Sequence, residues 1–249
     1  YVVTDKKLDK NLSKKILNVK NSFDFLKKVA TKKRNQFAGK VIAITGSVGK
    51  TSIKEFLKFF LSSEGIISAS IKSYNNYLGV LVSLINMDNN SIFSIFEVGT
   101  NNFNEIKKLS SLLRPQQVII SNIHPTHLQG FGTTRKIANE KSDLINPKYN
   151  PNIELVILPN FNKDEKYLKK LAKGYFINSI ITFGNYDQAD YSIKKIEKVN
   201  NFLSRIIFSS STTSTGTRSR VTVFLLLVSP SPVAVSLFLS LSFTLFSFP

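Results

Sequence analysis

Residues 41–51 read Val41-Ile42-Ala43-Ile44-Thr45-Gly46-Ser47-Val48-Gly49-Lys50-Thr51, and this stretch decides the fold. The apolar run Val41–Thr45 predicts a buried strand, and apolar residues recur at helical spacing through Thr51–Glu64. A strand, a glycine turn, Lys-Thr and a helix, in that order, form the arrangement that holds nucleotide phosphates. We therefore expect Lys50 to reach the outer phosphates and the Thr51 hydroxyl to ligate Mg²⁺.

The match to the general phosphate-binding loop is partial. Ile44 stands where the full pattern has its first glycine, five residues before Gly49, so only the inner Gly-x-x-Gly-Lys-Thr is present. A glycine turn that merely connects a strand to a helix is the alternative. The agreement of strand, turn chemistry and helix favours the phosphate site.

Composition narrows the function classes. The chain has 249 residues, enough for one large domain or two small ones, and a formal net charge of +18. That charge would suit a nucleic-acid partner, but the lysines are scattered among Asn and Ile, and no recognised nucleic-acid module is visible. Solvated lysine faces or a polyanionic small ligand explain the charge equally well. We expect no nucleic-acid partner.

The cysteine count and the first residues bear on location. The chain has no cysteine, which excludes disulfides, thiolate metal ligands and a cysteine nucleophile, and fits the cytoplasm. Tyr1–Asp5 shows no signal-peptide pattern and no starting Met, so we expect a cytoplasmic chain that begins within a longer protein.

Residue usage changes abruptly at Ser209. From there to Pro249 the chain has no Lys, Asn, Asp or Glu, although these residues dominate the polar positions before it. We interpret this segment as an aberrant, low-complexity or out-of-frame tail. A membrane anchor is an alternative, but Val221–Val228 is short and Pro230 and Pro232 follow it. A β-rich continuation is a third reading.

Strand and helix patterns alternate along the middle of the chain. The predicted strands are Val41–Thr45, Gly65–Ala69, Ile92–Phe96, Val118–Ile120, Glu154–Leu158 and Ile180–Phe183. The predicted helices are Thr51–Glu64, Asn76–Ile85, Glu105–Leu113, Thr134–Leu144 and Lys166–Ala172. This alternation predicts an α/β fold, with a mostly parallel sheet flanked by helices on both faces. Ligands of such sheets bind at the carboxyl ends of the strands, where Gly46, Glu97 and Asn122 all fall.

Four side chains could take part in metal binding or catalysis, and each could instead have an ordinary structural or surface role. Glu97 could hold Mg²⁺ opposite the phosphate loop, or be an exposed acid at a strand end. His124 and His127 are the only histidines; we read His124 as structural and His127 as a candidate for the site. By composition alone, Lys141 reads as a surface lysine.

Together these motifs resemble the Mur ligases of peptidoglycan synthesis, from about Leu17 to Ile207. The matching stretches are 45–55, 75–80, 97–101, 105–106 and 122–132, followed by Lys141. Ser47 and the run His127–Gly132 favour the branch that adds D-alanyl-D-alanine to UDP-N-acetylmuramoyl-tripeptide. Small departures are Ser73, Leu81 and Asn104, where Asn, Pro and Gly are usual.

The resemblance implies roles for these positions. The ATP-binding set is Gly46, Ser47, Val48, Gly49, Lys50, Thr51 and Ser52, with Asn122 near the nucleotide and Asn76 near the phosphates or the substrate. Thr51 and Glu97 would hold one Mg²⁺, and His127 would help hold a second. Lys141 matches a lysine that such enzymes carbamylate, which makes it a metal-facing carboxylate. Lys50, Lys141 and His127 are thus the expected catalytic residues.

The implied reaction transfers a phosphoryl group from ATP to a peptide carboxylate, and the amine of D-alanyl-D-alanine then attacks the acyl phosphate. The substrates are small molecules, and we expect a monomer without a membrane partner. Residues 1–36 correspond to a remnant of the substrate-binding domain, 37–208 to an incomplete central domain and 209–249 to the tail. Because whole domains of the family are missing, we expect this chain not to catalyse the full reaction alone.

Three other functions stay open on the sequence. The first is another Mur-type ligase or a ligase resembling folylpolyglutamate synthase. The second is an ATP-binding module without ligase activity. The third is a basic protein that binds membranes or nucleic acid. Loss of ATP binding on replacing Lys50 separates the first two from the third.

Overall fold

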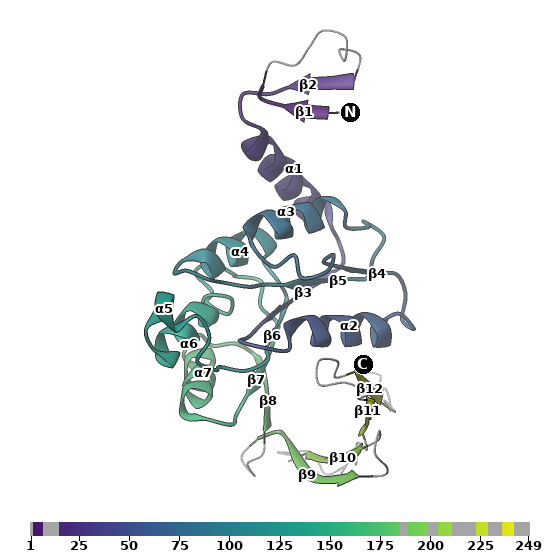
Figure 1. Cartoon of the computed structure of the whole chain (residues 1–249), viewed down its shortest axis with the longest axis vertical. Helices are drawn as coiled ribbons and strands as arrows, with labels where there is room; N and C mark the ends of the chain where they lie inside the picture. The colour runs from purple at the N-terminus through teal and green to yellow at the C-terminus, as the bar shows by residue number, and fades with distance from the viewer. Residues whose placement is uncertain are drawn as a thin grey trace.

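The computed structural model describes residues 2–6, 15–184, 189–198, 204–210, 223–228 and 236–241. Its main sheet is built from β3 (Lys40–Thr45), β4 (Ile67–Ala69), β5 (Phe93–Glu97), β6 (Gln117–Ile120), β7 (Leu155–Pro159), β8 (Ser179–Gly184), β9 (Tyr191–Lys198) and β10 (Ser204–Ser210). The eight strands lie in the order β10-β9-β8-β7-β6-β3-β5-β4 (Figure 1). Neighbours from β9 to β4 pair in parallel, and β10 is antiparallel to β9. This topology confirms the predicted α/β fold.

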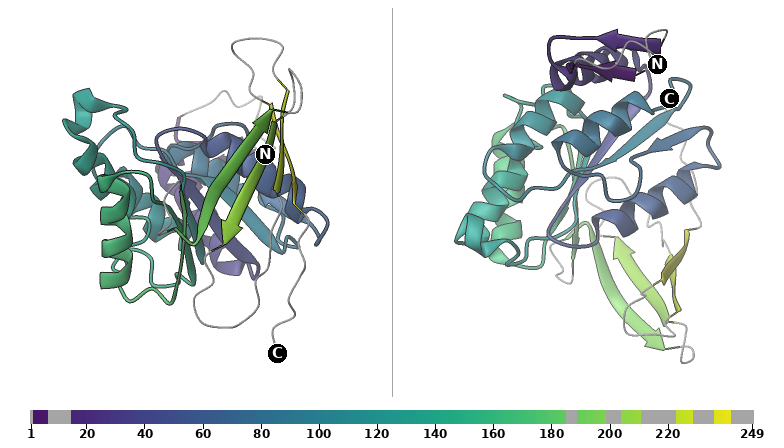
Figure 2. Two further views of the ribbon diagram at one scale, coloured as in Figure 1. Left: turned by 90° about the horizontal axis from the view of Figure 1, so that it is seen from below. Right: turned by 45° about the horizontal axis from the view of Figure 1, so that its top comes forward.

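The helices cover both faces of this sheet. They are α1 (Ser22–Gln36), α2 (Lys50–Leu61), α3 (Tyr77–Ile85), α4 (Glu105–Leu113), α5 (Leu128–Phe131), α6 (Thr134–Ser142) and α7 (Lys163–Gly174). The right-hand view of Figure 2 shows α2 on the side of the sheet opposite to α3 and α4. Within the described residues, helix α2 therefore covers one face, and the larger group of helices covers the other.

The central strand β3 explains this two-sided packing. Val41 and Ala43 belong to the core under α1, α3, α4, α6 and α7, whereas Ile42 and Ile44 pack towards α2. Successive side chains of a strand point to opposite faces, so an unbroken apolar run is buried on both sides. The same strand ends at the phosphate loop, which fixes that loop to the most buried part of the sheet.

Capping residues set several helix boundaries. The Asn76 side chain accepts a hydrogen bond from the Gly79 amide at the start of α3, and Thr133 accepts one from the Lys136 amide at the start of α6. Helix α4 has the predicted bounds. The residue before it, Asn104, has a φ of 68°, a left-handed conformation that Asn tolerates better than most residues. Asn104 thus takes a conformation that glycine adopts most readily.

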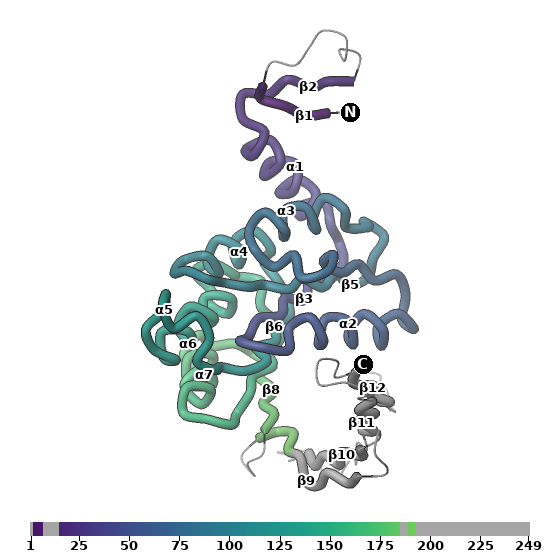
Figure 3. Tube along the Cα trace, viewed as in Figure 1, coloured from purple at the N-terminus to yellow at the C-terminus, as the bar shows by residue number. Residues whose placement is uncertain are grey.

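Several elements were not predicted. Strands β1 (Val2–Thr4) and β2 (Ile16–Asn18) form a parallel pair at the outer end of α1, and the trace in Figure 3 shows α1 leading from this pair to the sheet. Helix α1 packs on α3 and contacts α4. The buried Arg34 fixes the far end of α1, because its Nη2 donates to the Arg114 carbonyl at 3.0 Å.

Only parts of the 209–249 segment fall within the described residues. There, β11 (Val223–Val228) and β12 (Ser236–Leu241) form an antiparallel pair, which agrees with the β-rich reading. Pro230 and Pro232 lie outside the described residues. Among the helices that the structure describes, none has the length and apolarity to cross a bilayer. The proposed division at 36 and 208 stays a prediction.

Candidate functional site

The loop after β3 has the backbone of a phosphate-binding turn. Gly46 has a φ of 148°, and a Cβ on it would lie 1.8 Å from the Ser121 Oγ, so only glycine fits between the ends of β3 and β6. Gly49 has a φ of 83° with open space around it. Helix α2 begins at the next residue, Lys50, without a side-chain cap. Its first-turn amides therefore need an acceptor from elsewhere, as an anion would supply.

Residues after β6 hold this loop in shape. Asn122 Oδ1 accepts hydrogen bonds from the amides of Ser47 and Val48 at 3.1 and 3.0 Å, and its Nδ2 donates to the Val48 carbonyl. The Ser47 hydroxyl donates to the His124 carbonyl and accepts from the His124 amide. Asn122 thus acts on the loop backbone, and His124 contributes through its main chain, as the structural reading expected.

Two lysines far apart in the sequence meet at the loop. Lys50 Nζ donates to the Gly46 carbonyl at 2.9 Å, and Lys141 Nζ donates to the same oxygen at 3.1 Å. Lys141, on α6, is only 4% exposed, so the reading of it as a surface lysine is wrong. Burial lowers the pKa of Lys141 to about 7; the Lys50 charge adds to this effect, and Glu140 opposes it. Burial also lowers the pKa of Lys50, against the influence of Glu97.

Glu97 lies at the end of β5 next to the start of α2. It is 2% exposed, so the reading of it as an exposed strand-end acid is wrong. The Thr51 hydroxyl donates to its Oε2 at 2.8 Å, and the Asn75 amide donates to its Oε1 at 2.8 Å. The Glu97 amide donates to the Ser70 hydroxyl at 3.2 Å. These contacts hold a buried carboxylate beside the phosphate loop.

A second lysine of α2, Lys54, donates hydrogen bonds to the segment that leads to Asn75. Lys54 is fully buried, and its Nζ donates to the carbonyl of Ser70 at 2.9 Å and to the carbonyl of Lys72. Its ion pair with Glu55 measures 3.1 Å. Lys54 lies one helical turn after Lys50, so the same helix that presents Lys50 also positions the neighbours of Glu97.

Two other predicted site residues, His127 and Asn76, lie at the starts of helices α5 and α3. His127 has a φ of 55° and precedes α5, where its carbonyl accepts hydrogen bonds from Gly130 and Phe131. The Asn76 side chain caps α3. Across the part of the chain that the structure describes, no three His, Cys, Asp or Glu side chains gather to hold a metal ion. The predicted metal ligands are instead one carboxylate, one hydroxyl, one imidazole and one modified lysine: Glu97, Thr51, His127 and Lys141.

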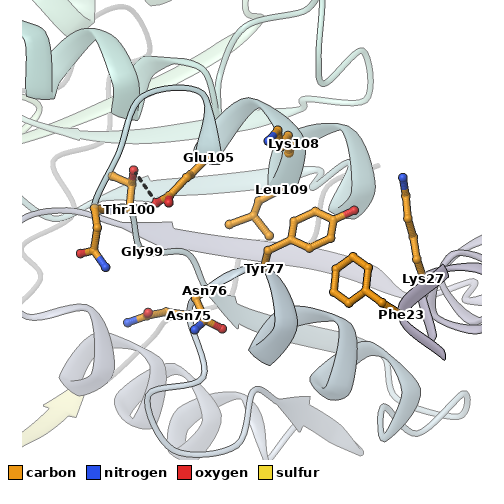
Figure 4. Close-up of a pocket in the computed structure, with 11 residues that line it drawn as sticks. Phe23, Lys27, Asn75, Asn76, Tyr77, Gly99, Thr100, Glu105, Lys108 and Leu109 are labelled. Atoms are coloured by element: carbon orange, nitrogen blue, oxygen red, sulfur yellow. Dashed lines mark hydrogen bonds between the residues drawn. The ribbon is translucent and has the colours of Figure 1, made fainter. Parts of the chain in front are cut away.

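A cavity of about 580 Å³ opens on the other side of Asn75. Figure 4 shows Lys27 and Phe23 of α1 on one side of it, and Glu105 and Lys108 of α4 on another. Asn75 lines this cavity and also donates to Glu97. Asn75 therefore links the cavity to the acid that faces the phosphate loop, although Glu97 itself does not line the cavity.

Comparison with known proteins identifies the family. The profile of the Mur ligase middle domain matches residues 44–222. The chain belongs to the Mur ligase family. Its match to this profile confirms the resemblance drawn from the phosphate loop and the residues at the strand ends.

Individual relatives agree with this Mur ligase assignment. The UDP-N-acetylmuramoyl-tripeptide–D-alanyl-D-alanine ligase of Rickettsia prowazekii is 38% identical over 190 residues, which cover 76% of this chain and 41% of that protein. A MurF crystal structure from Acinetobacter baumannii has a TM-score of 0.70 at 26% identity, covering 87% of this chain and 45% of that one. The fold is also similar to that of MurF ligase from Thermotoga maritima in complex with ADP, with a TM-score of 0.70 at 24% identity, covering 84% of this chain and 46% of that one. The chain thus spans less than half the length of these relatives.

Sequence reasoning missed several residues of this Mur ligase site. No role was predicted for Asn75, Ser70, Lys54 or Ser121, although each contacts the loop, Glu97 or the segment beside it. Asn75 lies next to the predicted Asn76, so the Asn-Asn pair was a usable signal. The other three are common residue types whose roles depend on contacts between distant segments.

Proposed function

We propose that this chain supplies the ATP site of a MurF-type ligase, which joins a peptide carboxylate to the amine of D-alanyl-D-alanine. The observation that supports this most is the convergence of Lys50 and Lys141 on the Gly46 carbonyl, beside the Thr51–Glu97 pair. The Lys50 ammonium group at the start of an uncapped helix suits the β- and γ-phosphates of ATP, and Lys141 lies beside it.

The acid and hydroxyl beside the loop fit Mg²⁺. Glu97 and Thr51 both offer oxygen ligands, the type that Mg²⁺ prefers, and the buried carboxylate supplies the negative charge. We propose that these two side chains hold one Mg²⁺ and that His127 helps hold a second. The ion would neutralise charge on the transferring phosphoryl group. Lys50 would contribute a fixed positive charge at the same phosphates.

We further propose that Lys141 carries a carbamate. Carbamylation needs a neutral amine, and the pKa of Lys141, lowered to about 7 by burial, supplies one near neutral pH. The amine nitrogen attacks CO₂ and forms the C–N bond, one C=O electron pair moves to oxygen, and the ammonium proton leaves to water. The product is a carboxylate, which would replace a second cation beside Lys50 with a metal-facing anion.

The cavity beside Asn75 is our proposed site for the acceptor carboxylate. Lys27 and Lys108 line it, and its acid, Glu105, accepts hydrogen bonds from the Asn101 and Asn102 amides. A peptide carboxylate there would meet the γ-phosphate near Glu97. That carboxylate would take the γ-phosphoryl group as the bond to ADP breaks and ADP leaves. The acyl phosphate would then react with the incoming amine, which loses a proton as phosphate leaves.

The complete reaction is proposed for the whole protein, since this chain spans 41% of the Rickettsia relative. UDP-N-acetylmuramoyl-tripeptide and D-alanyl-D-alanine are the proposed substrates, and the cytoplasm is the proposed location. We expect the chain by itself to bind ATP without completing ligation, because the reacting groups must be held together for turnover.

Nucleotide titration tests the ATP site. We expect ATP to bind the chain with Mg²⁺ present, and Lys50→Ala to weaken that binding about tenfold or more, as loss of a charge-assisted contact does. Lys58→Ala removes an exposed lysine from the same helix and serves as the control. Equal ATP affinity in both variants would contradict the proposal. With the full-length protein, a panel of acceptor and amine substrates then separates MurF-type ligation from the reactions of related ligases.

A further inference from the structure

A second cavity lies between α1 and α4, with a volume of about 550 Å³. We call it the α1–α4 groove. Four cationic side chains and no acidic ones line it: Lys27, Lys107, Lys108 and Arg114. Lys27 and Lys108 also line the cavity of Figure 4, so the two hollows are contiguous. A hollow of this size can take a small molecule.

The groove cations form no ion pair within the described residues. Ion pairs within the described residues join Lys40 to Glu154, Lys54 to Glu55 and Arg135 to Asp164, and none includes a groove cation. Asp143 acts electrostatically on Lys107. It lies outside the groove lining and is in no ion pair with the residues that the structure describes. An ordinary lysine face would leave such charges to water.

The surroundings of Arg114 distinguish this groove from an ordinary lysine face. Its Nη2 donates to Asn35, which also lines the groove, whereas its Nε is enclosed and has no hydrogen-bond partner among the described residues. Arg34 lies behind it, buried, and donates to the Arg114 carbonyl at 3.0 Å. Burial and the Arg114 charge lower the pKa of Arg34 to about 10, and no ion pair among the described residues includes either guanidinium group. An anion bound beside Arg114 would relieve this repulsion.

We propose that the α1–α4 groove binds a phosphate-bearing anion. Phosphate oxygens can accept from several donors at once, and the groove offers ammonium groups from both helices together with the Arg114 guanidinium and the hydroxyls of Tyr77 and Tyr149. Lys107 and Arg114 line this groove and not the cavity near Glu97. Changes at Lys107 and Arg114 therefore affect the groove without altering the lining of the proposed acceptor site.

The test uses inorganic pyrophosphate and the full chain carrying Lys50→Ala, so that the phosphate loop does not contribute. Calorimetric titration of this protein is compared with the same protein carrying Lys107→Gln and Arg114→Gln. A control carries Lys170→Gln and Lys173→Gln, which remove equal charge from the exposed face of α7. Lys107→Gln alone is also measured, because it leaves the Arg114–Asn35 hydrogen bond in place. Circular dichroism verifies that each variant is folded.

We expect pyrophosphate binding to weaken about tenfold or more in the groove variants and less than about twofold in the control. Vesicles of equimolar phosphatidylglycerol and phosphatidylcholine form the second arm. Binding confined to vesicles and lost in the groove variants would identify a lipid phosphate as the source of the anion. No binding of either probe, or equal losses in groove and control variants, would overturn the proposal.

Discussion

Lys50 and Lys141 donate hydrogen bonds to one acceptor, the carbonyl oxygen of Gly46, at 2.9 and 3.1 Å. Lys50 arrives from the helix that follows the loop, and Lys141 from α6, on the other face of the sheet. Two ammonium groups at one carbonyl repel each other. Either an anion bound between the two ammonium groups or the loss of one positive charge relieves that repulsion. In the proposed function, the ATP phosphates are the anion, and carbamylation of Lys141 removes one positive charge.

The lowered pKa of Lys141 predicts pH-dependent carbamylation. Burial places this pKa at about 7, so the neutral amine increases as the pH rises from about 6 to about 8. With ¹³C-labelled CO₂, we expect a carbamate signal in the NMR spectrum that grows over this range. Lys141→Arg should abolish the signal, and Lys136→Arg, at an exposed position on the same helix, should retain it. A signal unchanged in Lys141→Arg would disprove the assignment.

Replacing Glu97 tests the metal site. Glu97→Gln keeps the size of the side chain but removes the charge that would hold Mg²⁺. We expect the gain in ATP affinity on adding Mg²⁺ to fall about tenfold, with little change in metal-free binding. Glu64→Gln, at an exposed site beyond α2, is the control. An undiminished Mg²⁺ effect in Glu97→Gln, measured by the same titration, would exclude this residue as the ligand.

The buried Lys54 should matter for both stability and metal binding. Lys54→Met leaves the carbonyls of Ser70 and Lys72 without their donor. We expect the free energy of unfolding to drop by about 1–3 kcal/mol, the cost of unsatisfied buried polar groups. Because this segment carries Asn75, the Mg²⁺ effect on ATP binding should also shrink. Lys58→Met is the matched control, and identical behaviour of the two variants in denaturant titration and ATP binding would refute the role.

Asp143 predicts a dependence of stability on pH. Burial and the nearby Glu140 raise its pKa from 3.8 to about 6, with Lys107 opposing. The folded state therefore binds this proton more tightly than the unfolded state, so stability is lost as the pH rises through this interval. Asp143→Asn should unfold at a higher temperature than the original chain above about pH 6, and the difference should vanish below about pH 4. Asp88→Asn, at an exposed site, should show no such trend in thermal unfolding.

The sequence predicted the sheet and the loop well because their signals are local. The run Val41–Thr45, the glycines after it and the helical spacing beyond require no knowledge of distant contacts. The burial of Glu97 and Lys141 was not deducible from composition, since it depends on β5 and α6 meeting the loop. The position of Glu97 at a strand end already made it a candidate, whereas only the family resemblance pointed to Lys141. Helix α1 was missed because its buried face is small, with Ala30 and Arg34 its fully enclosed residues. The α1–α4 groove likewise exists only through the meeting of two helices.

The most direct test of the account is a crystal structure of this chain with a non-hydrolysable ATP analogue and Mg²⁺. We predict that the phosphates lie against Gly46–Thr51, with Lys50 Nζ on their oxygens and the metal ion on Thr51 and Glu97. A nucleotide bound elsewhere, or an ion far from Glu97 while the loop stays empty, would contradict the account.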